Sequence, residues 1–172
     1  MVLQECKIWA GVYMKQIVNL DTAKMLKRGN GGRFEVEFAS LTQTLGAEKL
    51  GVSLAILAPG KRAFPRHAHH ANEEMMFILE GTGTYHYGND SAPVRAGDLI
   101  AAPAGDASTA HQIENTSGKP MKYLTFSTMI APEVVEYPDS GKFLVSSGSG
   151  PDRFRFIGRA GTSLDYFDGE DG

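Results

Sequence analysis

Short β-prone segments, separated by turn residues, fill the centre of this chain. Within residues 33–39, for example, Phe34, Val36 and Phe38 alternate with Glu35 and Glu37, and this alternation is typical of a strand with one buried face. Glycine, proline, asparagine and aspartate mark the ends of most such segments. Parallel α/β folds need crossover connections of a dozen or more residues, for which the spacing leaves no room. The sequence therefore predicts an all-β fold, a sandwich or barrel of the jelly-roll kind.

The expected strands share alternation or β-branched content and end at a turn signal. A β-prone run over 15–20 precedes Asp21 and Thr22, which are candidates to cap one helical turn over 23–26. We expect almost no other helix, and we assign no function to residues 1–13. The predicted strands are 33–39, 52–57, 63–69, 75–80, 83–87, 93–95, 99–102, 111–114 and 122–129, with further candidates at 142–145 and 153–157.

Composition limits the class of partner. The 172 residues carry a net charge of −3, so no basic surface favours binding to nucleic acid or to an anionic membrane. A single cysteine, Cys6, excludes an internal disulfide. The chain shows neither a secretory signal pattern nor an apolar run long enough to cross a bilayer. We therefore expect a cytoplasmic protein whose partner is a small molecule.

Four of the five histidines lie in two places, residues 67–70 and residue 111. On a strand, residues i and i+2 share a face, so His67 and His69 would project to one side, about 6.6 Å apart along the chain. A carboxylate follows within five residues, and His111 would come from another strand. Three imidazole nitrogens and one carboxylate oxygen suit a divalent transition metal and leave one or two coordination positions open. By itself, however, a His-x-His sequence more often belongs to unrelated surface clusters.

Two segments resemble the two motifs of the cupin superfamily. Residues 60–81, GKRAFPRHAHHANEEMMFILEG, are similar to the first motif, in which a glycine, His-x-His, a glutamate and a second glycine follow in order. Residues 97–115, GDLIAAPAGDASTAHQIEN, resemble the second motif, with Pro-x-Gly, a histidine and an asparagine. The gap before His67 is one residue longer than the common form, and the loop between Gly105 and His111 is three residues longer. The resemblance extends over residues 45–142 to small bacterial single-domain cupins, some of which are loosely described as sugar-phosphate isomerases.

This resemblance implies a double-stranded β-helix (a cupin or jelly-roll barrel), usually a homodimer, that holds one divalent metal ion, with Zn, Fe, Mn, Ni and Co as candidates. The implied ligands are His67, His69, Glu74 and His111. Glu74 is preferred to Glu73 because it stands six residues before the motif's second glycine. We expect residues 1–44 to form an N-terminal extension with the first strands, 45–145 the cupin barrel and 146–172 a C-terminal extension.

The functional hypothesis is a metal-binding cupin that acts on or binds a small oxygenated molecule, as an isomerase-like enzyme whose metal is a Lewis acid. An Fe(II) dioxygenase and a non-catalytic binder of a sugar or small acid are the alternatives. Alternation places His86 opposite Tyr85 and Tyr87 without deciding which set faces the pocket, so all three are candidates for proton transfer, as are Tyr123 and Glu80. Asn115 is interpreted as a turn former and His70 as an exposed bend residue.

Overall fold

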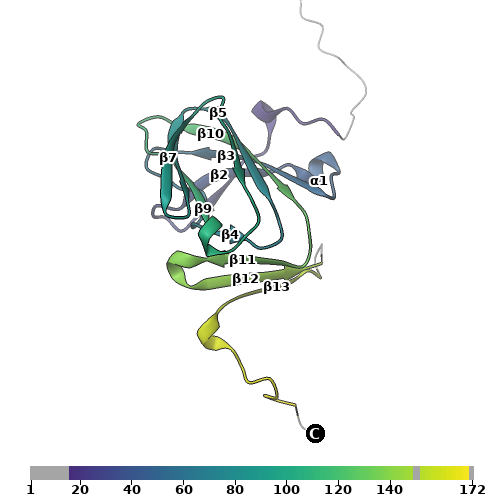
Figure 1. Cartoon of the computed structure of the whole chain (residues 1–172). Coiled ribbons are helices and arrows are strands. Elements are labelled where there is room, and N and C mark those ends of the chain that lie inside the picture. Colours follow the sequence, from purple (N-terminus) through teal and green to yellow (C-terminus); the bar gives the residue numbers. More distant parts are fainter. Residues whose placement is uncertain (1–15, 149–151, 171–172) are drawn as a thin grey trace, which may run out of the picture.

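The computed structural model describes residues 16–148 and 152–170, and strands dominate them (Figure 1). The helical elements of these residues are single turns: α1 (Thr42–Leu45) and the 3-10 turns Leu20–Thr22, Ala107–Thr109, Pro138–Ser140 and Ala160–Thr162. The predicted all-β, double-stranded β-helix fold is confirmed. Residues 1–13, to which we assigned no function, lie outside the described part of the chain.

One wall of the barrel is a six-stranded sheet in which every neighbouring pair is antiparallel. The longest strands lie at the centre of this sheet. The first two strands in the sheet order come from residues 1–44, which precede the barrel predicted over 45–145. In sheet order the strands are β1 (Leu26–Gly29), β2 (Glu35–Ser40), β3 (Leu50–Leu57), β10 (Met121–Thr128), β5 (Glu74–Glu80) and β8 (Leu99–Ala102).

Two smaller antiparallel sheets complete the barrel. The three-stranded sheet has the order β7 (Asp90–Arg95), β6 (Thr82–Tyr87), β9 (His111–Glu114). The four-stranded sheet, which contains the green strands at the lower side of Figure 1, has the order β13 (Phe154–Arg159), β12 (Lys142–Ser147), β11 (Glu133–Tyr137), β4 (Ala68–His69). Residues 62–67 join these two sheets through isolated bridges from Arg62 to Glu114 and from His67 to His111. We call this junction the seam.

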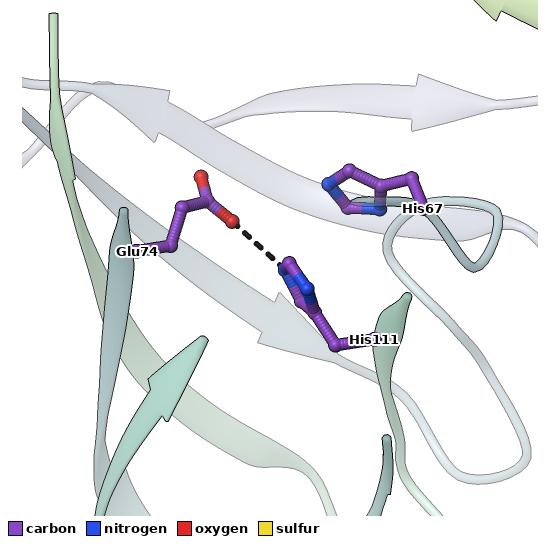
Figure 2. A group of neighbouring side chains, drawn as sticks. All are labelled: His67, Glu74 and His111. Atoms are coloured by element: carbon purple, nitrogen blue, oxygen red, sulfur yellow. Dashed lines mark hydrogen bonds and ion pairs between the residues drawn. The ribbon is translucent and has the colours of Figure 1, made fainter. Parts of the chain in front are cut away.

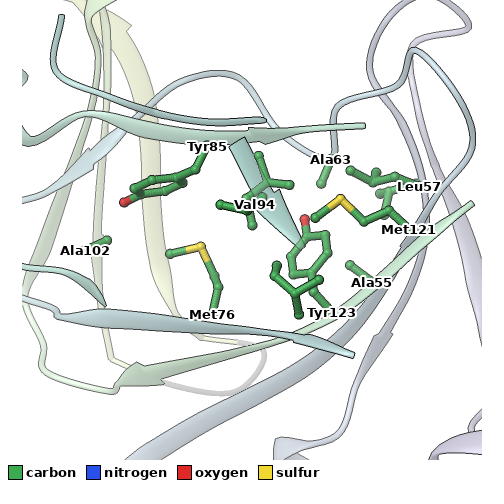
Figure 3. Close-up of a cluster of buried hydrophobic side chains, with 12 residues drawn as sticks. Ala55, Leu57, Ala63, Met76, Tyr85, Val94, Ala102, Met121 and Tyr123 are labelled. Atoms are coloured by element: carbon green, nitrogen blue, oxygen red, sulfur yellow. The ribbon is translucent and has the colours of Figure 1, made fainter. Parts of the chain in front are cut away.

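The barrel interior is packed with apolar side chains (Figure 3). Leu57, Ile78 and Met121 are fully buried in it. In β5 the alternation is as predicted, because Glu74, Met76 and Ile78 point inward while Met75 remains 42% exposed on the outer face. A second apolar cluster covers part of that outer face, where Val18 and Leu20 from the N-terminal segment pack with Leu54 and its neighbours.

The structure corrects two predicted elements. Residues 63–69 do not form a continuous strand; only Ala68–His69 does, because Pro65 has no N–H to donate and the chain bends through residues 63 and 64. The predicted helical turn over 23–26 lies instead at Leu20–Thr22, where the Asn19 side chain accepts a hydrogen bond from the N–H of Asp21 at 2.8 Å. Strands β1 and β11 were not predicted.

Among the described residues, no helix has the length and apolar character needed to span a membrane. The division at residues 45 and 145, the homodimer and the cytoplasmic location stay predictions.

Candidate metal centre

The seam fixes two histidines beside one another. The N–H of His67 donates to the carbonyl oxygen of His111 at 3.1 Å, and the N–H of His111 donates to the carbonyl oxygen of His67 at 2.8 Å. The Nδ1 of His67 lies 2.9 Å from the carbonyl oxygen of Pro65. If this contact is made by an N–H on Nδ1, Nε2 of His67 is the nitrogen with a free lone pair.

Glu74 approaches these histidines from the opposite wall. It is the first residue of β5, where it pairs with Ala102 of β8 and Ser127 of β10. Its Oε2 lies 3.1 Å from Nε2 of His111. One ligand atom from each of His67, Glu74 and His111 lies within 4.8 Å of the others, and Figure 2 shows the three side chains converging. This group can hold a metal ion.

His69, the fourth predicted ligand, lies next to this group but is not one of its three members. Its ring centroid is 5.0 Å from that of His67 and 6.2 Å from that of His111. Its Nε2 lies 3.7 Å from Oε2 of Glu74, and this nitrogen is buried without a hydrogen-bond partner. A buried polar atom left unpaired costs free energy. A metal ion bound here would satisfy it, so the donor set fits a metal.

Glu133 holds His69 in place and was missed by the sequence analysis. Its carboxylate is 3.3 Å from Nδ1 of His69 and accepts the backbone N–H groups of residues 70, 71 and 72, each at 3.1 Å. It also accepts a hydrogen bond from the side chain of Asn72. Glu133 is only 7% exposed. A signal was present, because Glu133 and Val135 alternate with Val134 and Glu136, which indicates a strand with Glu133 on its buried face.

The electrostatics of the group favour its metal-binding protonation states. Burial, reinforced by the charge of nearby His111, lowers the pKa of His67 to about 4. Burial acts to raise the pKa of Glu74, but the hydrogen bond to His111 and the neighbouring imidazoles outweigh it and hold the pKa below its usual range. Near neutral pH, His67 is therefore neutral and Glu74 is ionised, as coordination requires.

A cavity of about 320 Å³ opens beside the four residues. All three sheets contribute to its wall, which shows that they surround one common space. Besides His67, His69, Glu74 and His111, the lining consists of Phe38, Ser53, Ala63, Phe64, Pro65, Met76, Gln112, Ile113, Tyr123, Thr125, Val135 and Tyr137. Tyr137, which the sequence analysis did not select, stacks on His67 with ring centroids 6.0 Å apart.

The three predicted proton-transfer residues, Tyr85, His86 and Tyr87, do not line the cavity. Tyr85 is buried in the core, with its hydroxyl 3.4 Å from the carbonyl oxygen of Ala101. Tyr87 packs against that core, and Nε2 of His86 lies 3.1 Å from the Glu114 carboxylate. None of the three is among the residues that line the cavity, whereas Tyr123 is. Their catalytic role stays a prediction.

The side chains around the ligand set agree with the expected register. The side chain of Glu73 is exposed, and its backbone N–H donates a hydrogen bond to Oγ1 of Thr128 at 3.0 Å. His70 is also exposed, with Nε2 3.2 Å from the carboxylate of Glu136.

An antiparallel barrel with a histidine and glutamate cluster beside an internal cavity defines a class of small metal-binding β-barrels. Residues 53–127 match the family described as Cupin domain. The chain is a small protein of the cupin superfamily.

Proteins similar to this chain carry names that refer to different small molecules. A protein of Acidithiobacillus ferrooxidans, provisionally named a sugar phosphate isomerase, superposes with a TM-score of 0.74 at 25% identity, covering 88% of this chain and 96% of its own. A sugar phosphate isomerase of the cupin superfamily from Silicibacter pomeroyi gives a TM-score of 0.72 at 25% identity, covering 88% and 98%. The oxalate-binding protein of Thermotoga maritima is 28% identical over 104 residues, which are 60% of this chain and 84% of that protein.

Proposed function

We propose that this protein binds one divalent metal ion through His67, His69, Glu74 and His111 and uses it to hold a small oxygenated molecule in the adjoining cavity. The observation that carries the proposal is the convergence of His67, Glu74 and His111 within 4.8 Å, beside the unpaired Nε2 of His69. Four protein ligands leave coordination positions for a substrate or water.

A metal bound here would act as a Lewis acid that polarises a carbonyl or hydroxyl group. The described lining offers two further titratable side chains, Tyr123 and Tyr137. Burial raises the pKa of both phenols above the ordinary value. Near neutral pH they are protonated, so they suit donation of a hydrogen bond or proton to a ligand oxygen rather than abstraction of a proton.

The protonated state of these two phenols favours a second candidate function over an isomerase-like reaction, namely binding of a small molecule without catalysis. An isomerase-like reaction needs a base within reach of the substrate, and beyond the proposed ligands the described lining provides none at neutral pH. The names of the relatives, two sugar phosphate isomerases and an oxalate-binding protein, support small oxygenated molecules as the ligand class. Dioxygenation by an iron-loaded form is the remaining alternative.

Two neighbouring glutamates provide the test. Glu74→Gln keeps the shape of the side chain but replaces an anionic oxygen with a neutral amide, so metal affinity should fall at least tenfold. Glu73→Gln changes an exposed carboxylate, for which one screened interaction is worth about 1 kcal/mol or less, and affinity should hardly change.

Metal content and competition against a colorimetric chelator would be measured for both variants, with His111→Ala expected to behave like Glu74→Gln. Loss of metal in Glu73→Gln alone would show that the motif is read one residue out of register. Oxygen uptake by the iron-loaded protein would support the dioxygenase instead of the binder or isomerase.

A further inference from the structure

The cavity beside the proposed metal site is uncharged apart from that site. Its other lining residues are apolar or aromatic, except for the neutral polar side chains of Ser53, Gln112 and Thr125. Within residues 16–148 and 152–170, no lysine, arginine or additional carboxylate belongs to the lining. An anionic ligand would therefore find its positive charge at the metal alone.

The basic residues around the cavity are engaged outside it. The guanidinium carbon of Arg28 lies 4.8 Å from the ring centroid of Phe38, and Nζ of Lys142 lies 5.5 Å from that of Tyr137. Both rings line the cavity, but neither cation does. Neither cation therefore contributes a positive charge to the cavity wall.

Two arginines of the seam are also turned away. Arg62 forms an ion pair with Glu114 at 2.7 Å, and Arg66 forms one with Asp139 at 2.7 Å. Both line a separate surface hollow, while residues 63–65 between them line the metal cavity. The arginines that stand near His67 in the sequence are therefore not available to a ligand in the cavity.

Charge balance then restricts the ligand. A divalent metal and the Glu74 carboxylate leave one net positive charge among the proposed ligands, and the buried Glu133 carboxylate behind His69 adds a negative charge nearby. The site therefore accommodates at most one negative charge on the ligand. A dianion, such as oxalate or a sugar phosphate near neutral pH, would leave an unpaired negative charge among apolar side chains, and such burial is costly. A ligand with one or two oxygen donors would match the one or two coordination positions that such a donor set leaves open.

The rest of the lining suits an apolar group. Phe38 and Phe64 pack edge to face, with ring centroids 5.6 Å apart. Phe64 is 38% exposed and so marks the mouth of the cavity, whereas Tyr123 is buried. Aromatic side chains in such an arrangement favour a further ring or a branched aliphatic group. A volume of about 320 Å³ is at the small end for ligand sites, which limits the molecule to a small one.

We infer that the cavity selects a monoanion that has oxygen atoms to offer the metal and carries an apolar or aromatic group, as 2-oxo and 2-hydroxy acids with such side chains do. The inference rests on the proposed metal site. It separates this protein from its relatives named for sugar phosphates and oxalate, because it assigns the selectivity to uncharged residues of this chain's own lining.

Binding to the cobalt-loaded full chain tests the inference. The cobalt content of the protein is measured before and after each titration. The ligands titrated are phenylpyruvate, pyruvate, oxalate and glucose 6-phosphate, and binding is followed by the cobalt absorption spectrum and by the heat released. Phenylpyruvate should bind at least tenfold more tightly than pyruvate, because its ring buries apolar surface, and at least tenfold more tightly than either dianion.

A charge-adding variant tests the cause of the selectivity. Ser53 and Thr125 are paired across β3 and β10, and both line the cavity. Thr125→Lys should raise the affinity for glucose 6-phosphate about tenfold, and Ser53→Lys provides the same test at the neighbouring position. Thr116→Lys adds the same charge at an exposed position outside the cavity and should leave all four affinities unchanged.

The outcomes separate the inference from the proposed function. If the protein takes up no cobalt, the proposed function fails and the inference fails with it. If cobalt is bound but either dianion binds as tightly as phenylpyruvate, or none of the four molecules binds, the inference alone is overturned. Lysine variants that are folded and metal-loaded but gain no affinity for the dianions would show that the uncharged lining does not set the selectivity.

Discussion

Replacing Glu133 by glutamine tests whether His69 depends on its carboxylate partner. One oxygen, Oε1, accepts the N–H groups of His70 and Ala71, and the other, Oε2, accepts those of Asn72 and contacts Nδ1 of His69. A glutamine has one oxygen and one NH₂ group, so in either orientation at least two donors lose their acceptor.

The expected magnitude follows from that count. Each buried donor left unpaired costs about 1–3 kcal/mol, so the loss of two gives about 2–6 kcal/mol in the free energy of unfolding. Glu133 and His69 also border a second hollow of about 740 Å³, from which water can replace part of the loss and move the value toward the lower end. Removal of a carboxylate behind a ligating histidine lowers metal affinity by about ten- to a hundredfold.

Glu136→Gln is the matched control, since Glu136 lies on the same strand and contacts the exposed ring of His70 at 3.2 Å. Urea unfolding would give the stability of each variant, and chelator competition would give its metal affinity. We expect a change of less than twofold in the affinity of Glu136→Gln. If folded Glu133→Gln binds metal as the wild type does, Glu133 only anchors the bend at residues 70–72 and His69 is not held for coordination.

Two further predictions concern pH and packing. In the metal-free protein, burial lowers the pKa of His67 from its ordinary value of 6.5 to about 4, so the unfolded chain binds the proton first as pH falls. The contribution of His67 to the free energy of unfolding is therefore complete above pH 6.5 and is lost toward pH 4, by at most about 1.4 kcal/mol per pH unit. Urea unfolding with a chelator present should show a shallower pH dependence of stability for His67→Gln than for the wild type. Equal slopes would contradict the assignment. Gly83→Ala would place a Cβ 2.5 Å from the carbonyl oxygen of Glu114, so thermal unfolding should show a loss of about 1–3 kcal/mol, whereas Gly118→Ala, with no heavy atom within 4 Å, should be near neutral.

Alternation and motif spacing predicted the parts of the site that lie on regular strands. Glu74, Met76 and Ile78 share the inward face of β5, as period two requires, and Glu73 falls on the exposed side. Asn115 is a turn former as interpreted: its buried amide donates to the carbonyl oxygens of Leu57 and Lys119, both at 2.8 Å. Such local patterns survive folding because the side-chain period is a property of the strand itself.

The rest of the site depends on contacts between segments far apart in the sequence. Tyr137 meets His67 only because β11 pairs with β4, and Glu133 reaches His69 for the same reason. Alternation could not decide the facing of Tyr85 and His86, because both faces of β6 carry aromatic rings. Pairing of β6 with β9 and β7 decides it, and this pairing places His86 beside Glu114, away from the cavity.

The seam at His67 and His111 has a kinetic consequence. Two reciprocal backbone hydrogen bonds join His67, the residue before β4, to His111 of β9, and both are proposed ligands. Any opening that exposes these two amides to solvent therefore also separates the two ligands. Hydrogen exchange at the two amides and escape of the metal would then share one local opening step. The residence time of the ion would be set by the breathing of this junction, and a bound ion would in turn slow exchange at these two amides more than at others in the same sheets.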